Sequence, residues 1–356
     1  MKRVVSARRL ATLLLLLGAT RSVSAQAWTP PKGELDIGLT YHNLFVNNHL
    51  NSDGSGYDDG QIFTHMMTLD ITYAFTDRLV LRAGLPYVGV RYDGPSPHPR
   101  LLDSGPVPST PCSPCGIDNG KYHSTFQDFN VDLRYNLVRK RSLVLTPMFQ
   151  ANVPSHDYTY FAHSAVGRDL REFRLGLNVG RRLDPLLPNF FVQAQGAYRI
   201  IETVINYHRN GMYSEAELGY FVNRRVSLLG MATWSDTFGG FSYDPAVWNS
   251  VASTRDAIAQ GIITEQEFLH HDQIGHDRQF NAGGGVVYQL NPRFALFGSF
   301  TRTIAGANGH ALASAVAVGA NWTIQTRDRE KKVASLKALG GADTLAQARC
   351  MCPPKQ

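Results

Sequence analysis

The sequence lacks the features that define several large classes of protein. Beyond residue 25, no stretch approaches the roughly 18 consecutive apolar residues expected of a transmembrane helix. There are only 4 cysteines, and none follows the N-terminal apolar run, which argues against a lipoprotein anchor. No Gly-x-Ser-x-Gly or comparable catalytic signature occurs. These absences disfavour a helical membrane protein and a serine hydrolase.

The net charge is distributed unevenly along the chain. The formal charge is +6, but residues 1–25 carry five basic residues and no acid, and the tail from Arg327 carries seven basic and three acidic residues. Subtracting these contributions of +5 and +4 leaves −3 for the segment between them. No basic stripe with interleaved aromatic residues occurs there. We therefore expect no nucleic-acid partner.

The first 25 residues have the pattern of an export signal. Lys2, Arg3, Arg8 and Arg9 precede the apolar run ATLLLLLGA, and 23–25 reads Val-Ser-Ala, a small-residue cleavage site. The apolar run is shorter than the roughly 20 residues of a membrane-spanning helix. We expect a cleaved signal peptide over 1–25, with an uncleaved N-terminal anchor as the alternative.

Apolar and polar residues alternate strictly in the segments that follow. Between 63 and 75 the odd-numbered positions are mostly apolar, as at Leu69 and Ile71. The even-numbered positions carry Thr68, Asp70 and Thr72. Residues 128–137 divide in the same way. A period of two separates two faces of a strand, whereas helical spacing would mix them. The pattern predicts about twelve strands, at 34–45, 62–75, 79–90, 126–138, 142–153, 170–181, 190–204, 213–222, 226–238, 279–290, 294–304 and 310–324.

The connections between these strands alternate between short and long. The short set is rich in Asn, Asp, Pro and Arg, for example 76–78, 223–225 and 291–293. The other set is generally longer, as at 91–125 and 239–278. Such asymmetry is typical of bacterial outer-membrane barrels, which have short periplasmic turns and longer extracellular loops. The architecture of a soluble β-sandwich does not require this alternation of short and long connections.

We therefore predict an all-β fold, a closed antiparallel transmembrane β-barrel over 26–325. The mean hydropathy of −0.20 is compatible with it, because barrel strands average a lipid face and a lumen face. Aromatic residues lie towards strand ends, as girdles at the two membrane interfaces would require. We expect a monomer in the lipid of the bacterial outer membrane, with both termini in the periplasm. Residues 326–356 should form a periplasmic tail that is partly helical or disordered.

Charged residues are concentrated on the face opposite the apolar one. A charge facing lipid at the bilayer midplane costs about 2–4 kcal/mol, so these residues should line the lumen. The candidates are Asp70, Arg82, Asp128, Asp132, Arg134, Arg174, Arg199, Glu215 and Glu217. They could form a polar constriction that selects a small solute, or ion pairs that fill the lumen of a structural or adhesive barrel.

Other candidate sites are weaker. Ser155, His156 and Asp157 are adjacent in a loop, a spacing that rarely forms a catalytic triad, so a barrel hydrolase is the least favoured function and we predict no enzyme. We expect no cofactor and no metal site. The nearest metal-compatible group is His270, His271 and His276, with Glu265, Glu267, Asp272 and Asp277, whose spacing matches no defined site and which we interpret as a solvated loop.

The four cysteines form two close pairs. Cys112 and Cys115 lie in a predicted external loop, where a local disulfide is the default outside the cytosol. Cys350 and Cys352 are too close for an unstrained bridge and could bind a soft metal ion or pair elsewhere.

Several segments resemble a known family of Gram-negative barrels, described as transporters of the phenol-degradation meta pathway. These segments are 153–158 (VPSHDY), 167–173 (GRDLREF), 176–180 (GLNVG) and 288–293 (YQLNPR). The resemblance covers roughly 26–324 and reaches neither the C-terminal tail nor the cysteine pairs. It implies an outer-membrane channel or transporter for a small solute, aromatic or apolar, and assigns no functional residue.

Overall fold

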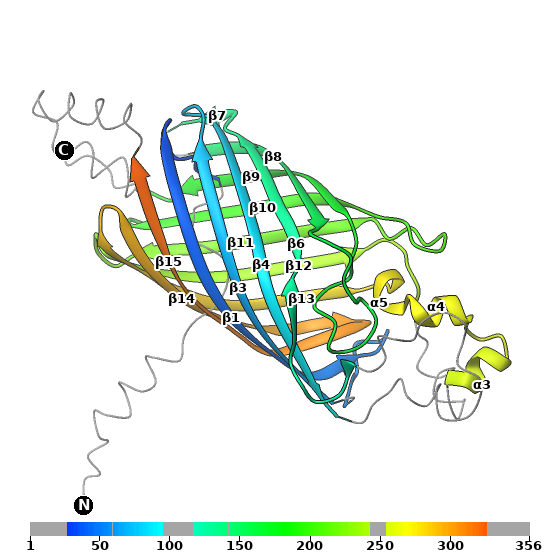
Figure 1. The fold of residues 1–356 in the computed structure, drawn as a ribbon. Helices are drawn as coiled ribbons and strands as arrows, with labels where there is room; N and C mark the ends of the chain where they lie inside the picture. The colour runs from blue at the N-terminus through cyan, green and yellow to red at the C-terminus, as the bar shows by residue number, and fades with distance from the viewer. Residues whose placement is uncertain (1–26, 59, 95–116, 141–142, 243–253, 326–356) are drawn as a thin grey trace, which may run out of the picture.

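The chain folds into a single closed β-barrel (Figure 1). The computed structural model describes residues 27–58, 60–94, 117–140, 143–242 and 254–325. The predicted signal peptide, all four cysteines and the C-terminal tail lie outside these residues. The strands are β1 (Glu34–Leu50), β2 (Gly56–Tyr57), β3 (Gln61–Ala74), β4 (Leu79–Asp93), β5 (His123–Phe126), β6 (Asp128–Tyr135), β7 (Val138–Arg139), β8 (Leu143–Pro154), β9 (Glu172–Arg182), β10 (Phe190–Ile201), β11 (Gly211–Phe221), β12 (Val226–Thr237), β13 (Arg278–Asn291), β14 (Phe294–Ala307) and β15 (Gly309–Gln325).

The barrel has twelve antiparallel strands, as predicted. β2, β5 and β7 are short segments that pair with a neighbouring strand, so the 15 segments make twelve barrel strands. Each barrel strand pairs with the next one in the sequence. β1 closes the barrel by pairing with β15, from Glu34↔Gln325 to Leu50↔Gly309. Closure gives every strand two neighbours, so no ladder edge is left unpaired in lipid.

The predicted strand positions agree with the structure to within a few residues, except where strands continue past the expected membrane boundary. β1 extends to Leu50 rather than 45, and β4 to Asp93 rather than 90. β10 instead ends at Ile201, three residues before the predicted end. These differences lie mainly at the end of the barrel that carries the long loops, where turn residues give no sharp signal in the sequence.

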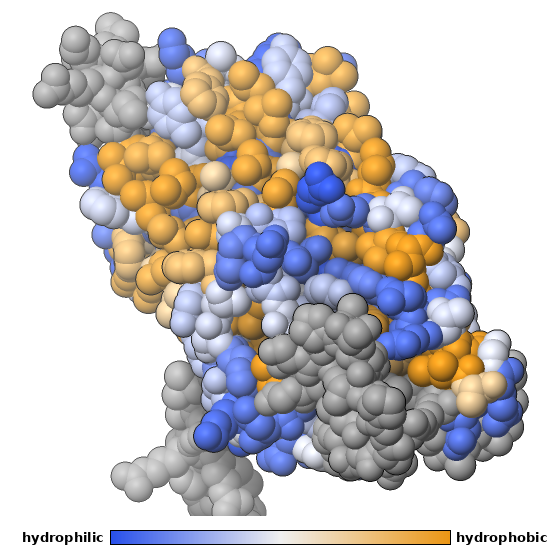
Figure 2. Space-filling model, turned by 45° about the vertical axis from the view of Figure 1, so that its right-hand side comes forward, coloured by the Kyte–Doolittle hydropathy of each residue, from blue (hydrophilic) through white to orange (hydrophobic). Residues whose placement is uncertain are grey.

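The outward face is a continuous apolar band. Leu39, Leu69, Leu175, Leu218 and Val318 come from five different strands, and each is about half exposed. Figure 2 shows this band over the barrel wall, with hydrophilic residues gathered towards the lower right, where the long loops lie. An apolar surface of this extent is stable only against lipid, so the barrel is a transmembrane one.

Aromatic side chains of the wall contact one another near both ends. Phe190 and Tyr220 lie close to the short turns, with ring centroids 4.6 Å apart. Near the long loops, Phe45 packs on Phe63 at 5.0 Å and Tyr87 on Phe126 at 5.2 Å. The arrangement is that of the two interfacial girdles expected from the sequence.

The two ends of the barrel differ as the sequence predicts. The turn end carries the short connections, such as 75–78, 222–225 and 292–293. The loop end carries 51–60, 94–122, 155–171, 202–210 and 238–277, with a single-residue connection at Asn308. The described part of the loop 238–277 forms the short helices α3 (Thr254–Ala259), α4 (Glu265–Leu269) and α5 (His271–Ile274), beyond the loop end in Figure 1.

Among the described residues, no helix is long and apolar enough to cross a membrane. The helix α4 begins with a capping box, in which Thr264 accepts a hydrogen bond from the Glu267 amide and Glu267 accepts one from the Thr264 amide. This pattern is readable in the sequence as Thr-x-x-Glu. The segment is thus a folded cap rather than the solvated polar loop expected, and it buries Phe268 and Ile274.

Candidate functional site: the barrel lumen

Four of the predicted lumen residues form a run of alternating charge on the wall near the turn end. The Arg82 guanidinium on β4 forms an ion pair with the Asp70 carboxylate on β3 at 2.9 Å. On the other side of β4, the residue of β6 directly opposite Arg82 is Asp132. Asp132 in turn contacts Arg134 at 3.0 Å. All four side chains are largely buried inside the barrel. Opposite charges on adjacent positions offset the desolvation that a lone charge would suffer there.

Gly84 makes room for the Asp70–Arg82 pair. It faces Asp70 directly across β3 and β4, and a Cβ atom at this position would lie 2.3 Å from the Asp70 Oδ1 atom. No side chain can occupy that space without displacing the carboxylate. Glycine at this position therefore leaves the Asp70 carboxylate in place beside Arg82.

A second charged group lies nearer the loop end. Glu172 on β9 accepts hydrogen bonds from Arg174 at 2.6 Å and from Arg199 on β10 at 2.8 Å. The Arg174 guanidinium also lies 4.5 Å from the centre of the Tyr213 ring. Glu172 was not among the predicted lumen residues. The sequence carried the signal for it, because residues two positions apart on a strand share a face and Glu172 is two positions from the predicted lumen residue Arg174.

The remaining predicted acids lie on β11 and β6. Glu217 accepts a hydrogen bond from Gln193 at 3.0 Å, and Glu215 accepts one from the Tyr213 hydroxyl at 2.8 Å. Asn178, Gln193, Gln195, Glu215 and Glu217 line a small pocket that is partly open to solvent. Asp128 lies at the loop end instead, where it accepts a 2.5 Å hydrogen bond from Tyr158.

The N-terminal segment enters the lumen at the turn end. Ala27 is fully buried, and its carbonyl oxygen accepts hydrogen bonds from Thr146 at 2.6 Å and Asn136 at 3.4 Å. Trp28 packs edge-on against the lumen-facing Phe191, with ring centroids 6.0 Å apart. Backbone groups that enter a barrel need partners there, and the inward polar side chains supply them. This segment narrows the bore from the turn end.

The loop 155–171 narrows the bore from the loop end. Its Tyr158 and Val166 join an apolar cluster with inward residues of β1, β3 and β4, including Val46, Ile62 and Val88. The Ser164 hydroxyl is fully buried and accepts a 3.1 Å hydrogen bond from the Tyr92 amide. The Gln127 side chain donates to the Val166 carbonyl at 2.6 Å. The loop is therefore packed into the lumen, not extended into solvent.

An ion-pair clamp joins this loop to the helical cap. Asp277 accepts hydrogen bonds from Arg168 at 3.2 Å and from Arg209 at 2.7 Å, and Gln273 donates to the Arg168 carbonyl at 2.7 Å. Burial by itself would raise the pKa of Asp277, but the Arg168 and Arg209 guanidiniums outweigh it and hold the pKa well below the usual aspartate range. The clamp is charged at neutral pH.

The sequence candidates for a metal site and for a catalytic triad do not converge. The ring of His270 contacts Gln273, that of His271 contacts the Phe268 carbonyl, and that of His276 contacts Asp236. His156 contacts Ser155 through one ring nitrogen and Thr125 through the other, both at 2.9 Å. Neither nitrogen is then left for Asp157, so this arrangement is not a catalytic triad.

No family model and no curated protein matches the chain.

Solved structures share the fold. The crystal structure of an outer membrane channel from Pseudomonas putida F1 matches with a TM-score of 0.60 and 14% identity, covering 85% of this chain and 100% of that one. The translocator domain of the autotransporter NalP from Neisseria meningitidis matches with a TM-score of 0.44 and 12% identity over 88% and 93% of the two chains. The NanC porin matches with a TM-score of 0.44 and 7% identity over 81% and 98%. The first of these similarities shows a common barrel architecture.

Proposed function

We propose that the protein is an outer-membrane channel for a small solute, held closed by the N-terminal segment and the loop 155–171. The observation that carries this proposal is the direction of the ion pairs in the lumen. Asp70–Arg82 and Glu172–Arg199 join neighbouring strands, and Asp132–Arg134 and Glu172–Arg174 join residues of one strand. These pairs follow the wall and do not span the bore.

The alternative is a structural or adhesive barrel whose lumen is permanently filled. A filled barrel of this kind would be favoured by charges paired across the bore. Here the material inside the bore is instead chain segments, residues 27–29 and 155–171, held by hydrogen bonds and ion pairs. Segments attached at surface connections can move as units, whereas a network that is part of the wall cannot.

The lining favours a solute with one apolar and one polar part. Val46, Ile62, Val88, Val90 and Tyr92 form an apolar wall beneath the loop 155–171. Arginine and glutamate side chains of the second charged group line the lumen on β9 and β10. This agrees with the aromatic or apolar solutes, and with the phenol-degradation transporters, that the sequence resemblance implies. A small aromatic acid or phenol would satisfy both parts of the lining.

We further propose that the turn end faces the periplasm and that the protein acts as a monomer. The pairing of β1 with β15 within one chain leaves no strand edge for a partner. With the turn end inside, both termini are periplasmic and the helical cap is outside. Protease added to whole cells should then cleave loops but spare the tail at Arg349, and external cleavage there would reverse this topology.

Swelling of proteoliposomes tests the proposal. Vesicles containing the purified protein should swell faster in a small aromatic acid or phenol than in a sugar of similar size. Equal rates for the two would reject the proposed solute class but keep the channel. Vesicles that swell no faster than protein-free ones, for every small solute tried, would favour the filled barrel.

A further inference from the structure

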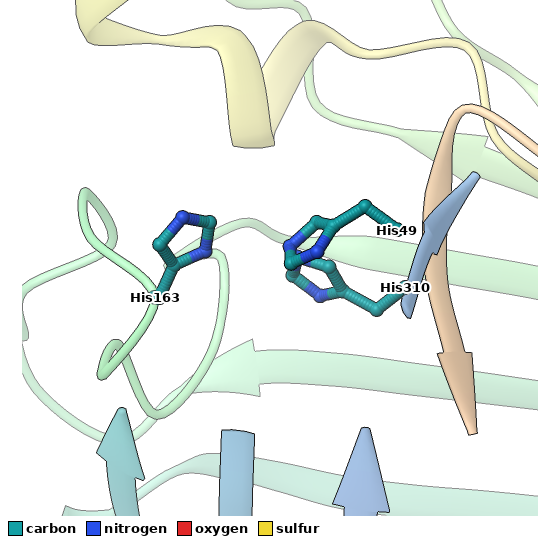
Figure 3. A group of neighbouring side chains, drawn as sticks. All are labelled: His49, His163 and His310. Atoms are coloured by element: carbon teal, nitrogen blue, oxygen red, sulfur yellow. The ribbon is translucent and has the colours of Figure 1, made fainter. Parts of the chain in front are cut away.

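Three histidines from distant parts of the chain meet at the loop end (Figure 3). His49 near the end of β1 and His310 at the start of β15 are direct partners across the strand pair that closes the barrel. His163 comes from the loop 155–171 and faces them. The ring centroids of His49 lie 4.5 Å from His310 and 5.0 Å from His163.

The rings are held in place by their surroundings. The His163 and Ser164 amides donate to the two carboxylate oxygens of Asp118 at 3.1 and 2.8 Å. The Tyr92 ring stacks on His163 with centroids 4.6 Å apart. His49 is 5% exposed, and its partner His310 is fixed by the strand ladder. A site assembled from these positions is built by the fold and not by chance loop conformations.

One nitrogen of each ring lies within 4.8 Å of the others. In a tetrahedral zinc site with Zn–N bonds of about 2.0–2.1 Å, ligand nitrogens are about 3.3 Å apart. Each of the three nitrogens would have to move by less than about 1 Å to reach that spacing. Side-chain rotation provides such a shift without a change in the backbone.

We propose that His49, His163 and His310 bind one divalent transition-metal ion, with Zn²⁺ the first choice. Imidazole nitrogen suits Zn²⁺, Ni²⁺ and Cu²⁺ better than it suits Mg²⁺ or Ca²⁺, which prefer oxygen ligands. Three protein ligands leave a fourth position for water.

The position of the site gives the ion a consequence for the channel. An ion bound here would tie the loop 155–171 to the β1–β15 closure, on which His49 and His310 lie. Together with the Arg168–Asp277 clamp, it would give the loop a second point of attachment. The bound ion would therefore keep the channel closed. This consequence rests on the proposed channel function, whereas metal binding itself does not.

Metal titration of the purified full chain, without a polyhistidine tag and after treatment with chelator, tests the binding. We expect one Zn²⁺ or Co²⁺ per chain by equilibrium dialysis, with the visible absorption of nitrogen-bound Co²⁺. Replacement of one ligand, H49A, H163A or H310A, should weaken binding by more than about 100-fold, which is the upper range for changes outside the ligand set. The controls H156A, in the same loop as His163, and H270A, in the loop 238–277, should bind as the wild type does. H163Q retains side-chain volume if H163A does not fold.

The proposal would be overturned if the wild-type protein took up no stoichiometric ion, or if binding were unchanged in H163A and H163Q. The histidine cluster would then be a packing contact between rings only. Channel conductance separates the two claims. Zn²⁺ should reduce the conductance of the wild type and not that of H163Q. Zn²⁺ that binds with no effect on an active channel would reject the locking role. Absence of conductance in every variant would count against the channel while the dialysis result still decides the site.

Discussion

Single residues in the lumen show how a charge is tolerated there. Glu172 is shared by Arg174 and Arg199, and all three side chains are largely buried. Its neighbour Glu202 pairs with Arg171 near the surface of the loop end, where both side chains are substantially exposed. The same two residue types therefore form one buried and one exposed pair within a short distance along the chain.

Replacing Glu172 by alanine should destabilise the barrel and change its ion preference. Removal of one partner of a buried ion pair costs about 3–5 kcal/mol, whereas an exposed pair contributes at most about 1 kcal/mol. Urea unfolding should show the larger loss for E172A and little change for E202A. The unpaired Arg174 and Arg199 should also shift the reversal potential towards anions. Equal losses of stability in E172A and E202A would contradict the burial argument.

Replacing Gly84 by alanine should break the Asp70–Arg82 pair, because the added Cβ would meet the carboxylate at 2.3 Å. Overpacking of this kind costs about 1–3 kcal/mol. Gly196 on β10 is the matched control, since a Cβ there has no heavy atom within 4 Å. The denaturation midpoint should fall in G84A and stay constant in G196A. A normal midpoint in G84A would mean that the carboxylate has room to move.

At the level of elements, the strands and the inward segments differ in how far the sequence predicts them. A strand is recognised from neighbouring residues, such as Leu69 and Ile71 against Asp70, because the period of two is local. The same parity identifies most of the charged lumen residues. The folding of 155–171 into the bore depends on contacts such as Arg168–Asp277 and Asp118–His163, whose partners are far apart in sequence. No local pattern reports these distances, so the clamp and the histidine cluster were not predicted.

The clamp makes a pH-dependent prediction. The pKa of Asp277 in the folded protein lies below its ordinary value of 3.8. Its contribution to stability is therefore fully present above pH 3.8, and it is lost as the pH falls through the lowered pKa of the folded protein. The backbone amides of the loop 155–171 should therefore keep their protection from hydrogen exchange from pH 7 down to about pH 4. D277N should expose the bonds after Arg168 and Arg171 to trypsin at neutral pH.

The control for this experiment is D53N, which changes an exposed aspartate of another loop that is bonded to Ser55. The sensitivity of D53N to trypsin within 155–171 should match that of the wild type. Resistance of D277N equal to that of the wild type would show that the apolar cluster alone holds the loop.

The N-terminal segment should act independently at the other end of the barrel. W28A removes the ring that packs on Phe191 and should loosen residues 27–29, so proteoliposomes should swell faster. Trp234 on β12, directly opposite the outward Phe280, is the matched control. W234A should change swelling little. Equal effects of the two substitutions would indicate general destabilisation in place of an open turn end.

At the level of the whole molecule, the wall and the bore have separate roles. The wall is complete in itself, since β1 and β15 pair along their full length and the apolar band faces outward. The ion pairs Asp70–Arg82 and Glu172–Arg199 follow this wall, whereas the segments 27–29 and 155–171 lie inside the bore. A complete barrel wall with separate segments inside its bore is the arrangement from which we propose a gated channel.

Conductance across a planar bilayer tests this arrangement most directly, with the wild type compared with the W28A/D277N double variant. The wild type should show brief openings, and the double variant should conduct steadily because both closing segments are released. Conductance in the double variant should keep a linear dependence on voltage, since the wall is unchanged. A bilayer that stays sealed with both proteins at every voltage tested would contradict the channel and support a permanently filled barrel.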